Sequence, residues 1–397
     1  MIVVTRALSS IDLGIYYGAT AYPQLLSRFF DLGLTHAARY YILMVPEARQ
    51  FIIRLLLIFS LIVFVPIFLI FFLFERLPLD TSEIISAVGE NYFILSVYCV
   101  LLIINSVLNS IVLSLERFKA LLWTAIMPYA FFIIIVIYKA SFLTLDVNDV
   151  LRQLLISEIL LLAIYLVAVL DLFRSDGKKT LLTAKEIFRY ALKIYPNSFL
   201  KPITTRLDRI ILSFIATPTF IGHYSILMTL REVSILPVTT YGQMLMNKLS
   251  GLLKNNRDQI SKLMTKSLIV IFLIYTAGFG VYFLIKDFVL HLFFKEVTSD
   301  MYITSYIILL SAIPLALFSL LTYYFLVTNN LAPISWAILA SVIVFYVVIF
   351  LGFKNLGTNV FSLAMLVSTI FSFSFLVAAK FKKLRGYSMK SKRARGV

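Results

Sequence analysis

Long apolar runs alternate with short polar stretches along almost the whole chain. A transmembrane helix takes about 20 mostly apolar residues, and many of these runs have that length. The pattern predicts eleven membrane helices, at 13–35, 52–74, 92–114, 121–138, 152–173, 188–214, 219–246, 267–285, 302–327, 334–353 and 359–380. The polar stretches between them are too short for a folded domain, the longest being 75–91, 174–187 and 247–266. We therefore expect an all-α, polytopic membrane protein.

Composition supports this class and excludes two others. Hydrophobic residues make up 61% of the 397 residues and charged residues only 14%, with a mean hydropathy of +0.95. Soluble globular proteins are about half apolar and about a quarter charged. Disordered chains are poor in the aromatic residues that are abundant here. The single cysteine, Cys99, excludes a disulfide framework within the chain.

The distribution of basic residues predicts the orientation in the membrane. The chain carries a formal charge of +16. In the loops and at the ends of the predicted helices, 23 Lys and Arg residues fall on the side of the C-terminus and 7 on the other. Cytoplasmic loops are enriched in Lys and Arg, so we expect a multi-pass protein of the cytoplasmic (inner) membrane with a cytoplasmic C-terminus. This bias explains the positive charge without a nucleic-acid partner, and the basic tail 381–397 could also contact membrane lipids.

An internal repeat divides the predicted helices into two sets. With an offset of 208 residues, Gly14 matches Gly222 and Tyr16 matches Tyr224. The repeat predicts an N-terminal bundle at 1–173, a cytoplasmic linker at 174–187, a C-terminal bundle at 188–380 and the tail. The full architecture would hold twelve helices around a central cavity. The counterpart of helix 188–214 would then begin before Met1, so we expect most of the first helix to be missing.

Charged residues inside the predicted helices are the candidate site, because charges at membrane depth are costly and normally face a cavity or a partner. A net excess of cations favours an anionic substrate. The basic candidates are Arg28, Lys193, Lys201, Arg206, Arg209 and Arg231, and the acidic candidates for charge partners or ion coupling are Asp31, Asp208 and Glu232. Arg28 and Asp31 are spaced to form a pair on one helix face. Glu158 is a further acid within a predicted helix. Lys193 and Arg209 lie near helix ends, where long basic side chains can instead extend to the membrane surface.

The sequence contains no pattern typical of an enzyme. The three histidines, His36, His223 and His291, lack the spacing of metal ligands. There is no phosphate-binding glycine-rich loop and no serine nucleophile motif. We expect no catalytic residues, no metal and no cofactor.

Two pairs of segments resemble a known family. Residues 4–16 (VTRALSSIDLGIY) with 30–40 (FDLGLTHAARY), and 207–214 (LDRIILSF) with 222–224 (GHY), are similar to the polysaccharide biosynthesis proteins of the O-antigen flippase type. These belong to the multidrug/oligosaccharidyl-lipid/polysaccharide exporter superfamily. The resemblance implies two helical bundles that move an undecaprenyl-diphosphate-linked oligosaccharide across the membrane by alternating access, with basic cavity residues facing the anionic group. It also implies a role in O-antigen lipopolysaccharide or exopolysaccharide synthesis, alongside a polymerase and glycosyltransferases.

Two other functions fit the same pattern less well. A cation-coupled drug antiporter of the same superfamily would favour an acidic cavity, whereas the residues found here are mainly basic. An integral-membrane polysaccharide polymerase would need catalytic residues in a sizeable outer loop. The longest outer stretch, 75–91, contains four acids but is short.

Overall fold

Every regular element that the structure describes is a helix. The computed structural model describes residues 2–76, 82–142, 145–174, 182–255, 257–294, 297–328, 330 and 332–395. Each of the eleven predicted segments coincides with a helix or a helix pair within these ranges. The prediction of an all-α membrane protein is therefore confirmed.

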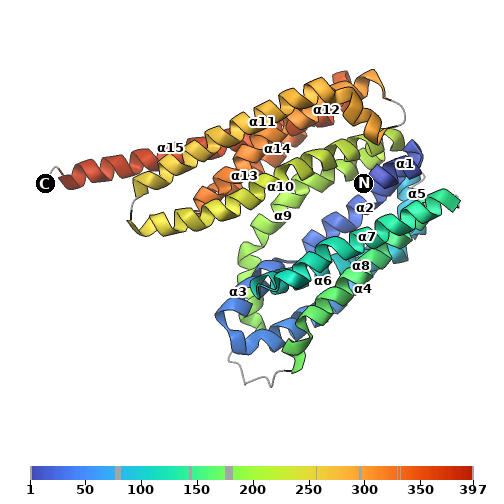
Figure 1. Cartoon of the computed structure of the whole chain (residues 1–397), viewed down its shortest axis with the longest axis horizontal. Helices are drawn as coiled ribbons and strands as arrows, with labels where there is room; N and C mark the ends of the chain where they lie inside the picture. Colours follow the sequence, from blue (N-terminus) through green and yellow to red (C-terminus); the bar gives the residue numbers. More distant parts are fainter. Residues whose placement is uncertain are drawn as a thin grey trace. The chain divides into compact units, whose positions relative to one another are not determined.

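The chain forms two compact units, Met1–His223 and Tyr224–Val397, whose helices are labelled in Figure 1. The first unit contains α1 (Ile2–Ala7), α2 (Ser10–Phe30), α3 (Leu34–Met44), α4 (Arg49–Arg76), α5 (Glu83–Glu90), α6 (Tyr92–Ser114), α7 (Phe118–Phe142), α8 (Val147–Arg174), α9 (Ala184–Ile215) and the first residues of α10 (Pro218–Asn255). The second contains the rest of α10 with α11 (Arg257–Phe293), α12 (Ser299–Leu310), α13 (Ala312–Val327), α14 (Ala332–Leu356) and α15 (Val360–Arg395). Short 3₁₀ turns lie at Pro46–Ala48 and Gly357–Asn359.

Helix α6 forms the centre of the first unit. It packs against α4, α8, α2 and α3, and 72% of its apolar stretch is buried. Only 28% of the corresponding stretch of α4 and 17% of that of α7 are buried. The outer side of α4 exposes large apolar residues such as Leu61, Ile62 and Val65. Such surfaces are costly in water but match a lipid environment.

The repeat predicts a linker at 174–187 and a second bundle from 188, and this division stays a prediction. By its contacts α9 groups with the first unit, and the two compact units divide after His223. The reason is long-range packing of α9 along α2 and α3. The hydroxyl groups of Tyr22 and Ser213 are 2.7 Å apart, and a Cβ atom on Gly33 would lie 2.4 Å from the Ala191 carbonyl oxygen. Residues 175–181 of the predicted linker lie outside the described residues.

The two glycines matched by the repeat lie in contact. A Cβ atom on Gly222 would lie 3.0 Å from the backbone nitrogen of Gly14. One on Gly14 would lie 1.7 Å from the Pro218 carbonyl oxygen, so the first turn of α10 packs directly against α2. Both glycines belong to the first unit, so this close approach packs the start of α10 into that unit.

Three predicted segments differ locally from the structure. The segment 13–35 is broken after Phe30, because Leu32 and Gly33 adopt φ values of 47° and 81°. The segment 302–327 divides into α12 and α13 at Ser311. The predicted polar loop 75–91 contains α5, whose Ser82 cap accepts a hydrogen bond from the Ile85 amide and whose apolar side is buried.

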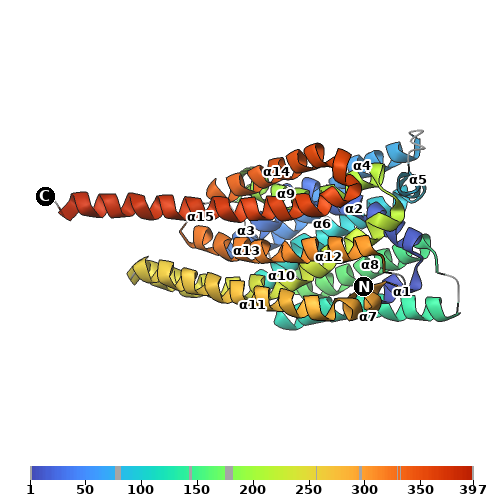
Figure 2. The same cartoon turned by 90° about the horizontal axis from the view of Figure 1, so that it is seen from above.

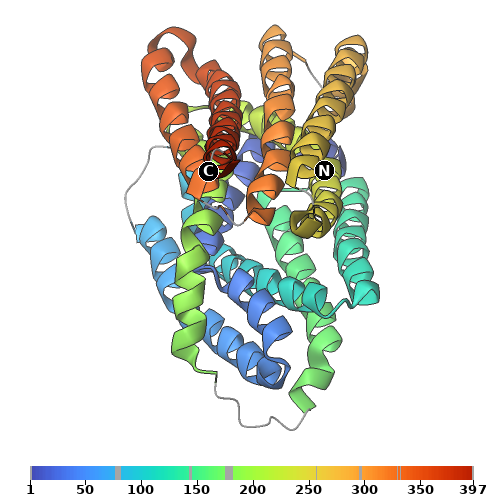
Figure 3. The ribbon, with the colours of Figure 1, turned by 90° about the vertical axis from the view of Figure 1, so that its left-hand side faces the viewer.

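The second unit has its own core. Helices α14 and α15 make its most extensive contact, and α13 packs against both α11 and α15. Leu320, Leu321 and Phe325 of α13 meet Leu376 of α15 and Met264 of α11 in this core. Figures 2 and 3 show α15 continuing as a helix toward the C-terminus. Its backbone therefore includes most of the predicted tail 381–397 as a helix up to Arg395.

Seven stretches of the described residues are long and apolar enough to cross a membrane. They cover eight of the eleven predicted segments, because Ala332–Phe381 contains the last two. The other three predicted spans, α2, α9 and α10, are helical but more polar. These three helices carry eight of the nine charged site candidates, and the ninth, Asp31, directly follows α2.

Candidate functional site

Arg28 and Asp31 are connected through two hydroxyl groups rather than paired directly. Arg28, whose side chain is exposed, donates from Nη1 to the Ser106 Oγ of α6 at 3.0 Å. Asp31, only 4% exposed, accepts from the Thr35 hydroxyl at 2.7 Å and from the Thr35 amide at 3.2 Å. The Thr35 and Ser106 hydroxyl oxygens are 3.2 Å apart. The direct Arg28–Asp31 ion pair expected from the spacing is not among the ion pairs of the described residues.

The turn between α2 and α3 places these groups against α6. Asp31 follows the last residue of α2, and the Leu34 amide donates to its carbonyl oxygen at 2.8 Å. Gly33 occupies the left-handed region that glycine tolerates without a steric penalty. Ser110, one turn beyond Ser106, donates to the Thr35 carbonyl oxygen at 3.0 Å. The turn thus fixes a cation at the surface and a carboxylate beneath it.

A second polar cluster surrounds Glu158 of α8. Asn105 donates from its side-chain amide to Glu158 Oε2 at 2.7 Å and to the Glu158 carbonyl oxygen at 3.1 Å. Four phenol groups lie close enough to this carboxyl group to interact with it electrostatically, those of Tyr16, Tyr98, Tyr129 and Tyr165. The sequence singled out Glu158 as a membrane acid but did not include it in the site. Asn105 and Ser106 were missed, although a polar pair inside the apolar run 92–114 was a signal for them.

Helix α9 brings two of its cations close to tyrosines of α6 and α2. Arg206 interacts electrostatically with Tyr98, and Arg209 with Tyr17. Arg209 is 3% exposed and Asp208 is fully buried, with Asp208 Oδ1 accepting from the Arg209 amide at 2.8 Å. Polar interactions of this kind lower the cost of burying charged groups in a low-dielectric environment.

The remaining α9 candidates lie closer to its first turns. Lys193 is exposed. The side chain of Lys201 lies outside the described residues. Within the first unit, the structure therefore brings together Arg28 with Asp31, Arg206 with Tyr98 near Glu158, and Arg209 with Tyr17. Lys193 is not part of either cluster among the contacts of the described residues.

Arg231 and Glu232 of α10 belong to the second unit. Arg231 is 1% exposed, and its Nη1 lies 4.0 Å from the Met228 sulfur. Glu232 is half-buried. The neighbouring residues Ser225 and Tyr224 are fully buried. An arginine this deeply buried needs polar partners to be stable. Charged residues buried in membrane helices usually mark a functional site, so Arg231 stays a site candidate.

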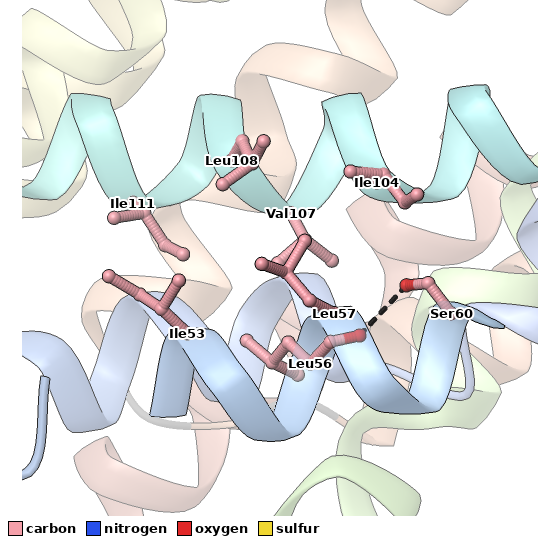
Figure 4. Close-up of a pocket in the computed structure, with 8 residues that line it drawn as sticks. All are labelled: Ile53, Leu56, Leu57, Ser60, Ile104, Val107, Leu108 and Ile111. Carbon is pink, nitrogen blue, oxygen red and sulfur yellow. Dashed lines mark hydrogen bonds between the residues drawn. The ribbon is translucent and has the colours of Figure 1, made fainter. Parts of the chain in front are cut away.

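An apolar depression lies between α4 and α6, apart from the charged residues (Figure 4). Its lining includes Ile53, Leu56, Leu57 and Ser60 of α4 with Val107 and Leu108 of α6. Ser60 donates its hydroxyl hydrogen to the Leu56 carbonyl oxygen of its own helix at 2.9 Å. The depression consequently offers aliphatic surface and is not part of the polar site.

Comparison with protein families identifies this chain. The model of a family described as polysaccharide biosynthesis protein matches residues 1–243. The chain belongs to this polysaccharide biosynthesis protein family. The matched region contains all nine charged candidates. A search of curated proteins finds no match.

Solved structures of transporters share the fold of this polysaccharide biosynthesis family member. A multidrug resistance MATE family transporter of the MOP superfamily, in an inward-facing conformation, is 14% identical with a TM-score of 0.69, covering 96% of this chain and 95% of its own. The lipid II flippase MurJ, in an inward closed conformation, is 14% identical with a TM-score of 0.67, covering 93% of this chain and 85% of its own. A MOP superfamily transporter from Pyrococcus furiosus is 13% identical with a TM-score of 0.63, covering 95% of each chain. At this identity the likeness establishes the fold.

Proposed function

We propose that this polysaccharide biosynthesis family member is a flippase that moves a lipid-linked oligosaccharide across the cytoplasmic membrane by alternating access. The family match over residues 1–243 carries the proposal. The likeness to a lipid II flippase supports it, because that substrate is also lipid-linked. The exposed Arg28 supplies the chemistry. Its guanidinium group is held by a neutral hydroxyl and makes no ion pair with a carboxylate of the described residues.

Arg28 has the properties that recognition of a diphosphate requires. A guanidinium group presents five donors in a fixed fork and binds phosphate oxygens bidentately. One donor is used on Ser106, which orients the group. We propose that the others receive the anionic diphosphate of the substrate. The other cations, Lys193, Lys201, Arg206, Arg209 and Arg231, are proposed to keep the substrate path electropositive, with Asp31, Asp208 and Glu232 as charge partners or coupling groups.

The surrounding biology follows from the same proposal. The 23 to 7 distribution of Lys and Arg supports a cytoplasmic C-terminus in the inner membrane. The substrate would be made by glycosyltransferases on the cytoplasmic side and consumed by a polymerase on the other. The product would be O-antigen lipopolysaccharide or an exopolysaccharide.

The test is leaflet exchange by the purified full chain in liposomes that contain a fluorescent undecaprenyl-diphosphate oligosaccharide. We expect the label in the inner leaflet to become accessible to an external quencher, with no change in glycan length. Longer glycans would instead identify a polymerase. No exchange above protein-free liposomes, with the full chain correctly inserted, would contradict the proposal.

A cation-coupled drug antiporter is the second candidate, favoured by the MATE fold that covers almost the whole chain. The same liposomes distinguish it, because an antiporter would move a cationic dye against an imposed sodium or proton gradient. We expect no dye transport, since the charged residues of the predicted path are mainly basic and would repel a cation.

A further inference from the structure

Lys380 is a cation buried in the core of the second unit. It lies on α15, in the last residue of a predicted span, and is only 7% exposed. Its ammonium group donates to the Thr265 hydroxyl of α11 at 3.2 Å and lies 5.5 Å from the centre of the Tyr324 ring of α13. Three helices of the unit therefore meet around one positive charge.

No carboxylate of the described residues neutralises this charge. The ion pairs of those residues are Arg117–Asp171 and Lys139–Asp149, both in the first unit. An ammonium group has three N–H donors, and Thr265 accepts only one of them. Burial of an ammonium group without an anion is unfavourable, and a ring face compensates only in part.

The repeat shows what is absent at this position. In the first unit, Arg117 and Asp171 form an ion pair with an N–O distance of 2.5 Å. Shifted by the repeat offset of 208 residues, they correspond to Phe325 and Ala379, which adjoin Tyr324 and Lys380. The second unit thus has neither the cation nor the acid at the equivalent positions, and Lys380 lies beside the counterpart of the acid.

The approach to Lys380 is itself basic. Thr265 is exposed, and Lys262 and Lys266 of the same helix are exposed as well. Lys262 lies three residues before Thr265 and shares its face of α11, whereas Lys266 directly follows Thr265. Two exposed cations close to Thr265 in the chain, together with Lys380, attract a compact anion with several acceptor oxygens.

We propose that this end of the second unit binds a phosphate group, with Lys380 and Thr265 as its ligands and Lys262 and Lys266 at its entrance. The phosphate supplies to Lys380 the negative charge that no carboxylate of the described residues supplies. Two sources share this chemistry: the headgroup of an anionic lipid in the adjacent leaflet, and inorganic phosphate. The inference is independent of the substrate that the protein carries.

The experiment compares thermal unfolding of the purified full chain in detergent with three additions at equal ionic strength: phosphatidylglycerol, phosphatidylcholine and inorganic phosphate. A ligand that binds only the folded state raises the Tm. We expect phosphatidylglycerol to raise the wild-type Tm by several degrees and phosphatidylcholine to have little effect. A comparable rise with inorganic phosphate would identify a free-anion site, whereas no such rise would identify the lipid headgroup.

Variants separate binding from a purely structural role. Without added ligand, the Tm of Lys380→Met should equal or exceed that of the wild type, because the variant removes an uncompensated buried charge. With phosphatidylglycerol, Lys380→Met should lose the rise in Tm that the wild type shows, which we call the increment. Lys380→Arg should keep the increment, and Lys354→Met, at an exposed lysine near the end of α14, should not change it. Thr265→Val should reduce the increment if Lys380→Met does not fold. Equal increments in wild type, Lys380→Met and Thr265→Val, or no increment in the wild type, would overturn the proposal.

Discussion

Arg28 illustrates how one charged residue acquires a defined role from neighbours far away in the sequence. Its spacing from Asp31 predicts an ion pair. In the structure, Arg28 instead donates a hydrogen bond to Ser106 of α6, and the Asp31 carboxylate accepts one from Thr35. A paired arginine would have much of its charge neutralised. In the observed arrangement the positive charge stays available, which is the property that binding of an anionic substrate requires.

We therefore expect Arg28→Gln to reduce leaflet exchange by roughly tenfold or more, because a hydrogen bond to a charged group contributes about 1.5–3 kcal/mol. Arg28→Lys should retain part of the activity, since it keeps the charge but loses the fork. Initial rates in liposomes measure the effect, and equal protein levels with an unchanged Tm serve as the control. Wild-type rates in Arg28→Gln would remove Arg28 from the substrate path.

At the scale of elements, the contact of α9 with α2 and α3 organises the first unit. It depends on close approach at Gly33, where a side chain would collide with the Ala191 carbonyl oxygen. It also depends on where α9 begins. Thr183 caps that end by accepting from the Glu186 amide, and Glu186 accepts in return from the Thr183 amide at 3.0 Å.

Gly33→Ala should destabilise the first unit by at least about 1–2 kcal/mol, the penalty of a left-handed conformation for a residue with a Cβ atom. The collision with α9 adds to this cost. Thermal unfolding in detergent measures the change. Gly278→Ala in α11 is the matched control, because no atom lies within 4 Å of its added Cβ, and we expect it to be neutral or slightly stabilising. Equal Tm values for the two variants would contradict the close approach.

The cap predicts a pH-dependent effect. The hydrogen bonds from Thr183 lower the pKa of Glu186 from its ordinary value of 4.5. Because the pKa is lowered on folding, this stabilisation is fully present above the ordinary pKa and is lost as the pH falls through the lowered pKa of the folded state. Thr183→Ala should speed amide exchange in the first turn of α9 at pH 7, and should have a smaller effect at a pH below that lowered pKa. Lys185→Ala, in the same turn, should not speed amide exchange. Equal exchange rates in the two variants would contradict the cap.

At the scale of the whole molecule, the distribution of charge determines how the helices insert. Among the described residues, seven stretches are long and apolar enough to cross a membrane, while α2, α9 and α10 are more polar than these seven. Other helices of the protein, such as α4 and α7, expose apolar surface instead. Polar helices can therefore reside within the membrane when neighbouring helices cover their polar groups.

The topology can be checked with reporter fusions to the full chain. A green fluorescent protein at the C-terminus should fluoresce and an alkaline phosphatase there should be inactive, because the 23 to 7 bias places this end in the cytoplasm. Fusion of the phosphatase within 143–146, between α7 and α8, should give the opposite result. An active phosphatase at the C-terminus would reverse the predicted orientation.

The sequence alone determined the helix content, the membrane class and the positions of the eleven segments, because each depends on local runs of apolar residues. The repeat was also visible in the sequence, because matching residues such as Gly14 and Gly222 lie at a constant offset. What only the tertiary structure decided depends on contacts between residues far apart in the chain: the break at Gly33, the inclusion of α9 in the first unit, and the partners of Arg28, Glu158 and Lys380. Hydropathy describes how a helix meets lipid, but whether a buried charge meets an acid, a hydroxyl or a ring depends on which helix lies beside it.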